Sequence, residues 1–155
     1  MHINPDHFLE TENGRVITPE LNRRAWERCY ESLEAALGEA LPGTRVFVIV
    51  GPQGAGKSAW VRSRAPELAP AIFFDAILVK RSEREPILAA ARRHGVPAVA
   101  VWMRTPLDLC ISRNAGRPAD EIVPEQAIRN VFAAVEPPSP EEGFERVIEV
   151  SAHGT

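Results

Sequence analysis

Residues 45–62 have the sequence RVFVIVGPQGAGKSAWVR, and this stretch decides the fold. It opens with an unbroken apolar run from Val46 to Val50, which is typical of a strand buried on both faces of a helix-covered parallel sheet. A glycine-rich turn follows, and a helix is expected from about Ser58. A buried strand, a tight turn and a helix together form the basic unit of an α/β fold.

The turn itself has the pattern G-x-x-x-x-G-K-S, which is the P-loop pattern in its expected position between a strand and a helix. Glycines allow consecutive backbone N–H groups to turn toward phosphate oxygens, and the helix N-terminus adds a positive partial charge. Lys57 is predicted to reach the β- and γ-phosphates, and the Ser58 hydroxyl to ligate Mg²⁺. We therefore predict ATP and Mg²⁺ as cofactors. The predicted nucleotide-binding residues are Gly51, Pro52, Gln53, Gly54, Ala55, Gly56, Lys57, Ser58 and Ala59. The alternative is a glycine-rich turn with an exposed lysine.

The rest of the chain alternates between helical and strand patterns. The predicted helices are 19–41, a helix from Ser58 interrupted before Pro66, 82–95, one capped by Thr105 and ending near Gly116, and 124–135. The predicted strands after the P-loop are 71–75, 96–103 and 146–150. Such alternation predicts an α/β P-loop NTPase fold with three α/β/α layers and a mostly parallel sheet of about five strands.

The organisation expected is a single kinase-like domain over residues 1–155. Residues 1–44 would supply an N-terminal strand and a long helix, and residues 45–150 the P-loop core with a lid at about 113–123. At this length, and with 45% hydrophobic and 25% charged residues, the chain can bury a substantial core. The composition excludes a coiled coil and a disordered tail.

Charge is distributed unevenly along the chain, whose formal net charge is −3. Residues 1–44 carry 4 basic and 8 acidic side chains, residues 118–155 carry 2 and 8, and the middle of the chain is basic. A chain without a net positive charge is not expected to bind long nucleic acid tightly, because such binding needs many contacts between cations and phosphates.

The sequence also carries indications of location. No segment has the roughly 20 consecutive apolar residues of a membrane span, and the first residues lack the basic and apolar regions of a secretory signal. These features predict a cytoplasmic protein that does not contact membranes. Cys29 and Cys110 lie on predicted helices and are expected to be buried thiols rather than a disulfide or metal ligands.

Three further side chains are candidates for the reaction itself. Asp75 ends an apolar strand, where open α/β sheets bind their ligands, and could hold Mg²⁺ or orient an acceptor. Arg113 and Arg117 lie at a helix end that runs into the polar lid, where they could neutralise charge on a transferring phosphoryl group. The alternative readings are a turn cap for Asp75 and cations that favour a helix C-terminus for the arginines.

The motifs together resemble the polynucleotide-kinase-like branch of the P-loop kinases, which is grouped with AAA-type and zeta-toxin-like ATP-binding proteins. Members of that branch transfer the ATP γ-phosphate to a nucleic-acid 5′-hydroxyl or a related acceptor. The resemblance rests on GPQGAGKSAW at 51–60, FFD at 73–75, CISRNAGRP at 110–118, which is similar to the family's R-N-x-x-R lid, VP at 123–124, and EGF at 142–144. It implies an ATP-dependent kinase.

One motif stands out of order in this comparison. In the family a segment of the type I-N-x-D follows the P-loop helix and supplies the general-base aspartate, whereas here the matching residues are Ile3 to Asp6. We hypothesise a circularly permuted element order, in which Asp6 would accept the proton of the acceptor hydroxyl. The family's arginine three residues after that aspartate is replaced by Leu9, which leaves the acceptor open.

Several functions are compatible with these motifs. The first is a phosphotransferase that moves the ATP γ-phosphate to a hydroxyl acceptor, for which a polynucleotide 5′-hydroxyl, such as a short nucleic-acid end, is one candidate. The second is a nucleotide-binding ATPase switch without an acceptor, and the third is a small-molecule kinase of the toxin or antibiotic-modifying kind. The presence and chemistry of a phosphorylated acceptor distinguish them. The sequence makes no prediction of oligomeric state.

Overall fold

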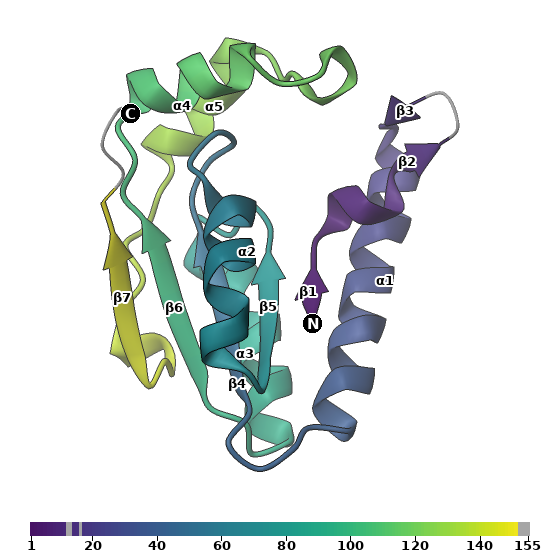
Figure 1. Cartoon of the computed structure of the whole chain (residues 1–155), viewed down its shortest axis with the longest axis vertical. Helices are drawn as coiled ribbons and strands as arrows, with labels where there is room; N and C mark the ends of the chain where they lie inside the picture. The colour runs from purple at the N-terminus through teal and green to yellow at the C-terminus, as the bar shows by residue number, and fades with distance from the viewer. Residues whose placement is uncertain (12–13, 16, 152–155) are drawn as a thin grey trace.

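A computed structural model describes residues 1–11, 14–15 and 17–151 of the chain. Five strands form one sheet, and all of its neighbouring strands are parallel. Across the sheet, the strands are β1 (His2–Ile3), β5 (Ala71–Asp75), β4 (Arg45–Val50), β6 (Ala98–Met103) and β7 (Arg146–Val150) (Figure 1). The strand that precedes the P-loop, β4, is therefore central, and the predicted five-stranded parallel sheet is confirmed.

Five helices and several short elements complete the described fold. The helices are α1 (Pro19–Gly38), α2 (Lys57–Leu68), α3 (Arg81–Arg93), α4 (Leu107–Ala115) and α5 (Glu125–Ala133). The short elements are the 3₁₀ helices η1 (Pro5–Phe8), η2 (Ala119–Glu121) and η3 (Pro140–Glu142), and the antiparallel pair β2 (Glu10–Thr11) and β3 (Gly14–Arg15). None of the helices in the described part of the chain combines the length and apolar character needed to cross a bilayer.

The core lies on both faces of the sheet, because alternate residues of β4 point to opposite sides. Val48 packs with Leu33 of α1 and Ile87 of α3 on one face. Phe47 packs with Trp60 of α2, together with residues of α4 and α5, on the other. Helices thus cover both faces, which is the three-layer architecture expected from the continuous apolar run of β4.

The N-terminal segment forms the edge of the sheet beside β5. Ile3 pairs in register with Phe74, and the backbone N–H of Phe73 donates to the carbonyl of Met1 (2.8 Å). Helix α1 follows at the right of Figure 1 and packs against α3 on one face of the sheet. The first strand in sequence is thus placed next to the strand that carries Asp75. The permuted element order stays a prediction.

Three predicted helix boundaries were wrong. Helix α1 ends at Gly38 and not at residue 41, because glycine is a poor helix former. Helix α2 continues through Pro66 to Leu68. Proline has no N–H, so Pro66 removes one helical hydrogen bond, the one to the carbonyl of Arg62. Arg62 is an exposed residue, so the loss costs little. Thr105 does not cap α4: the helix makes no side-chain cap, and the Thr105 hydroxyl instead donates to the carbonyl of Ala55 in the P-loop (2.7 Å).

Both cysteines are free thiols without exposed surface, as predicted. Burial raises the pKa of Cys29 to about 12 and also raises that of Cys110. Because the thiolate is the reactive form, the folded protein should resist iodoacetamide at about pH 8, where an ordinary thiol begins to ionise. Mass spectrometry should find both sites alkylated only after denaturation. Rapid labelling of the folded chain would contradict their burial.

Candidate functional site

The P-loop joins the centre of the sheet to the N-terminus of α2. Gly54 and Gly56 have φ angles of +80° and +95°, in the left-handed region that favours glycine. A Cβ atom at Gly54 would also collide with the backbone carbonyl of Cys110 in α4. Glycine is therefore required at position 54 for two reasons. The loop is also held by the Thr105 hydroxyl, which precedes α4 and donates to the carbonyl of Ala55.

Lys57, the first residue of α2, folds its side chain back over the loop. Its Nζ donates to the carbonyl oxygens of Gly51 (2.9 Å) and Pro52 (2.8 Å). Burial lowers the pKa of Lys57, and the negative charge of Asp75 partly offsets this effect. The amine is thus held against the loop, where its partly desolvated positive charge would gain from binding phosphate.

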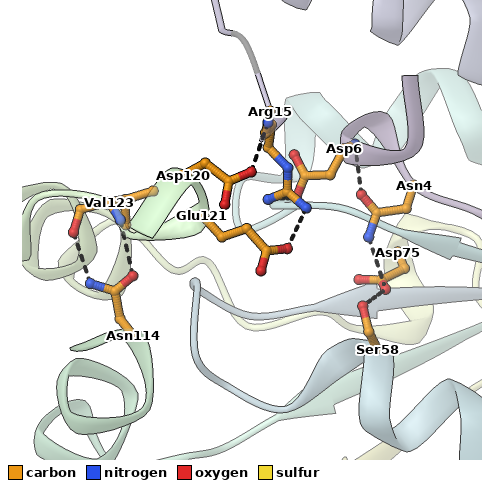
Figure 2. A network of polar contacts seen from close by, with 9 residues as sticks. All are labelled: Asn4, Asp6, Arg15, Ser58, Asp75, Asn114, Asp120, Glu121 and Val123. Atoms are coloured by element: carbon orange, nitrogen blue, oxygen red, sulfur yellow. Dashed lines mark hydrogen bonds and ion pairs between the residues drawn. The ribbon is translucent and has the colours of Figure 1, made fainter. Parts of the chain in front are cut away.

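Asp75 lies beside Ser58 at the carboxyl end of β5 (Figure 2). Its Oδ2 accepts a hydrogen bond from the Ser58 hydroxyl (2.5 Å) and one from the Asn4 amide (3.2 Å), and His2 Nε2 lies 2.8 Å away. Burial disfavours the charged carboxylate, but the hydrogen bond with His2, the charge of Lys57 and the hydrogen bond from Ser58 together lower its pKa. Asp75 is therefore a buried, ionised carboxylate.

This donor set fits Mg²⁺. A hydroxyl and a carboxylate side by side are the oxygen ligands that the ion prefers. Within the described ranges, no three or more His, Cys, Asp or Glu side chains are grouped as a metal cage. An ion at Ser58 and Asp75 would therefore complete its shell with nucleotide phosphates and water, as Mg²⁺ commonly does.

A cavity of about 610 Å³ opens in front of the loop. It is bounded by the P-loop, the N-terminal segment and the polar stretch after α4. Most of the predicted site residues line it: Asp6, Gln53, Gly54, Gly56, Lys57, Ser58, Ala59, Asp75, Arg113 and Arg117. Three loop residues, Gly51, Pro52 and Ala55, are buried and do not line the cavity. The structure thus brings together residues that lie up to 111 positions apart in the sequence.

One side of the cavity is cationic. The Arg113 guanidinium lies over the loop, since its Nη1 would be 3.2 Å from a Cβ at Gly56. Arg117 and Lys57 line the same cavity, and so does Arg62 of α2, which the sequence analysis missed. Arg62 lies four residues after Ser58, and residues i and i+4 share a helix face. This spacing could have indicated that Arg62 lies at the site.

The opposite side carries Asp6 and an arginine that sequence reasoning also missed (Figure 2). Asp6 Oδ2 lies 3.4 Å from Nη1 of Arg15, whose Nη2 donates to Glu121 (2.6 Å). The backbone N–H of Arg15 donates to Asp120 (2.7 Å). The β2–β3 hairpin is therefore tied to η2. No motif around Arg15 signals this tie, because Asp120 and Glu121 lie more than a hundred residues away in the sequence.

The predicted lid at about 113–123 is a loop with a fixed stem. The buried Asn114 amide donates to the carbonyl of Val123 (2.8 Å) and accepts from its backbone N–H (3.0 Å) (Figure 2). This reciprocal pair closes the loop at its base, and Arg15 holds its middle through Asp120 and Glu121.

Comparison with known proteins gives a match to one protein-family model and matches to solved structures. The AAA domain family matches residues 68–138, a segment that begins after the P-loop and spans less than half of the chain. A solved structure of the Deinococcus radiodurans tunicamycin resistance protein is 13% identical, with 76% of this chain and 78% of that chain covered, at a TM-score of 0.33. That likeness is too low to carry any functional argument. No curated protein matches the chain significantly.

Proposed function

We propose that this protein is a Mg²⁺- and ATP-dependent phosphotransferase that moves the γ-phosphate of ATP to a hydroxyl acceptor. The observation that carries the proposal is one cavity lined by a P-loop lysine, a Ser58–Asp75 pair and a second carboxylate, Asp6. The AAA domain match over the following segment supports a nucleotide-binding role.

The nucleotide half of the site would work by positioning and electrostatics. The loop N–H groups and Lys57 would bind the β- and γ-phosphates, and Ser58 and Asp75 would hold Mg²⁺. The bound ion would supply positive charge to the phosphate oxygens. Arg113 and Arg117 line the same space and would stabilise charge on the transferring group.

On the acceptor side, Asp6 is the proposed general base. It would take the hydroxyl proton as the oxygen–phosphorus bond forms and the bond to the β-phosphate oxygen breaks, with ADP as the leaving group. Arg15, 3.4 Å from Asp6, would keep the carboxylate oriented toward the cavity. The position of β1 beside β5 supports this role, because it brings the N-terminal I-N-x-D segment to the strand end that holds Asp75.

Asp6→Asn tests this assignment. The amide cannot accept the proton, so kcat for transfer should fall about 10²-fold, in the range typical of general-base loss, while the KM for ATP stays unchanged. A coupled assay of ADP release measures both values. Asp108→Asn is the matched control, since Asp108 is an exposed aspartate of α4 that does not line the cavity. Equal activity of Asp6→Asn and wild type would remove Asp6 from the mechanism.

The identity of the acceptor separates this proposal from a nucleotide-binding switch. A kinase forms a phosphorylated product, whereas a switch binds ATP and releases phosphate slowly at a rate that no hydroxyl compound alters. The resemblance in sequence implies a polynucleotide 5′-hydroxyl as the acceptor, and a small molecule is the alternative.

A further inference from the structure

The chemistry of the cavity walls narrows the acceptor further. We propose that it is a compact hydroxyl compound with an apolar or aromatic body, uncharged or cationic, rather than the 5′ end of a polynucleotide. This inference rests on the proposed phosphotransferase function. It is carried by three properties of the Asp6 side of the cavity: its enclosure, its apolar lining and the sign of its charges.

The enclosure comes from the contact between the N-terminal hairpin and the lid. Arg15 binds Asp120 through its backbone N–H and Glu121 through its guanidinium. These bonds connect β3 to η2 beside the cavity, so chain segments bound the Asp6 side from two directions. A space of about 610 Å³ that must also receive phosphates is of small-molecule size.

Apolar side chains line this side of the cavity. Trp26 is held in place by Phe74, whose ring centroid is 6.0 Å away. Leu9, three residues after Asp6 in the sequence, is buried, with 4% of its surface exposed. The residues of this apolar wall are Leu9, Ile17, Trp26, Ile77 and Ile122. Two of them, Ile17 and Ile122, are 57% and 44% exposed and come from distant segments. A ligand with an apolar body would remove this surface from water, which is favourable.

The charges on the two sides of the cavity have opposite signs. Lys57 and Arg113 lie at the P-loop on its nucleotide side, and Arg62 and Arg117 also line the cavity. The acceptor side carries Asp6, Asp120 and Glu121, and Arg15 contacts all three. The acidic flanks of the sequence therefore meet here. They would repel a second polyanion, whereas a neutral or cationic compound meets no such penalty.

Ligand-observed NMR tests the inference without requiring turnover. The protein is saturated with Mg²⁺ and a non-hydrolysable ATP analogue, and adenosine, thymidine, 2-phenylethanol and 2-amino-1-phenylethanol are compared with short 5′-hydroxyl DNA and RNA. We expect at least one compact compound to bind about 10-fold or more tightly than either oligonucleotide, a difference of one decade in Kd. Thymidine 3′-phosphate should bind more weakly than thymidine. Tighter oligonucleotide binding, or no binding by any compact compound, would overturn the inference.

A substitution at Ile122 tests whether the compact ligand binds against the apolar wall of the cavity. Ile122→Glu should weaken the compact ligand about 10-fold or more, and Leu41→Glu should not, because Leu41 is 67% exposed and does not line the cavity. Affinity for the ATP analogue should stay the same in both. Equal ligand affinity in the two variants would contradict the proposed location. Binding without any phosphoryl transfer would count against the proposed function alone.

Discussion

Replacing Lys57 with alanine should lower phosphoryl transfer by about 10³-fold, in line with the loss of a preorganised charge from a phosphoryl-transfer site. The Lys57 ammonium is held at the P-loop, 2.8 to 2.9 Å from two loop carbonyls. Because burial of Lys57 disfavours its charged form, the alanine variant should unfold at the same temperature as wild type or slightly higher.

The chain's other lysine provides the control. Lys80 is exposed, and it caps α3 through its backbone N–H, which donates to Glu83 (3.0 Å). Lys80→Ala therefore removes the same charge and keeps the cap, and it should retain full activity. Initial rates of phosphoryl transfer and thermal unfolding temperatures should be measured for both variants and for wild type. Retention of more than about a tenth of wild-type turnover by Lys57→Ala would be incompatible with a P-loop lysine acting on the transferred phosphate.

The largest expected effect on stability concerns Arg84, which is fully buried in α3. Its guanidinium donates twice to the Glu142 carboxylate (2.8 and 2.9 Å) and also to the carbonyls of Leu78 (2.9 Å) and Glu136 (3.0 Å). Arg84→Met leaves a buried carboxylate and two carbonyls without these partners. Removing one partner of such a pair costs about 3 to 5 kcal/mol, which urea denaturation should measure as a large fall in midpoint.

Two comparisons isolate the cause of this loss. The double variant Arg84→Met with Glu142→Leu should recover much of the stability, because it removes the uncompensated charge. Arg45→Met breaks a surface pair with Glu145 and should leave the midpoint nearly unchanged, since exposed pairs contribute little. If Arg84→Met unfolds at the wild-type urea concentration, the buried pair has no role in holding η3 and the preceding loop to α3.

The sequence predicted those parts of the fold that local patterns determine. The apolar run of β4, the glycine turn and α2 are adjacent in the chain, so their geometry follows from propensity and burial. Asp75 could be identified because a parallel strand presents its carboxyl end to the ligand edge. The path of α2 through Pro66 could not be predicted, because a proline in the last turn costs little where the carbonyl it frees belongs to an exposed residue.

The remaining parts depend on contacts between distant segments. Arg84 belongs to a sequence rich in arginine and glutamate that resembles a solvated helix face, and its burial follows only from the return of Glu142, 58 residues later. Arg15 likewise has no distinguishing neighbours, and its position between Asp6 and Glu121 arises from a pairing across 106 residues. Local patterns carry no record of such pairings, so the acceptor side was less predictable than the P-loop.

The fate of the γ-phosphate is the most direct test of the central claim. The protein is incubated with γ-labelled ATP, Mg²⁺ and the hydroxyl compounds and oligonucleotides described above, and the products are separated. We expect the label in an acid-stable phosphoester formed in equal amount to ADP, and its absence with Lys57→Ala. Label recovered solely as inorganic phosphate, at a rate that no hydroxyl compound changes, would show that the protein is not a phosphotransferase for these acceptors and would contradict the proposed function.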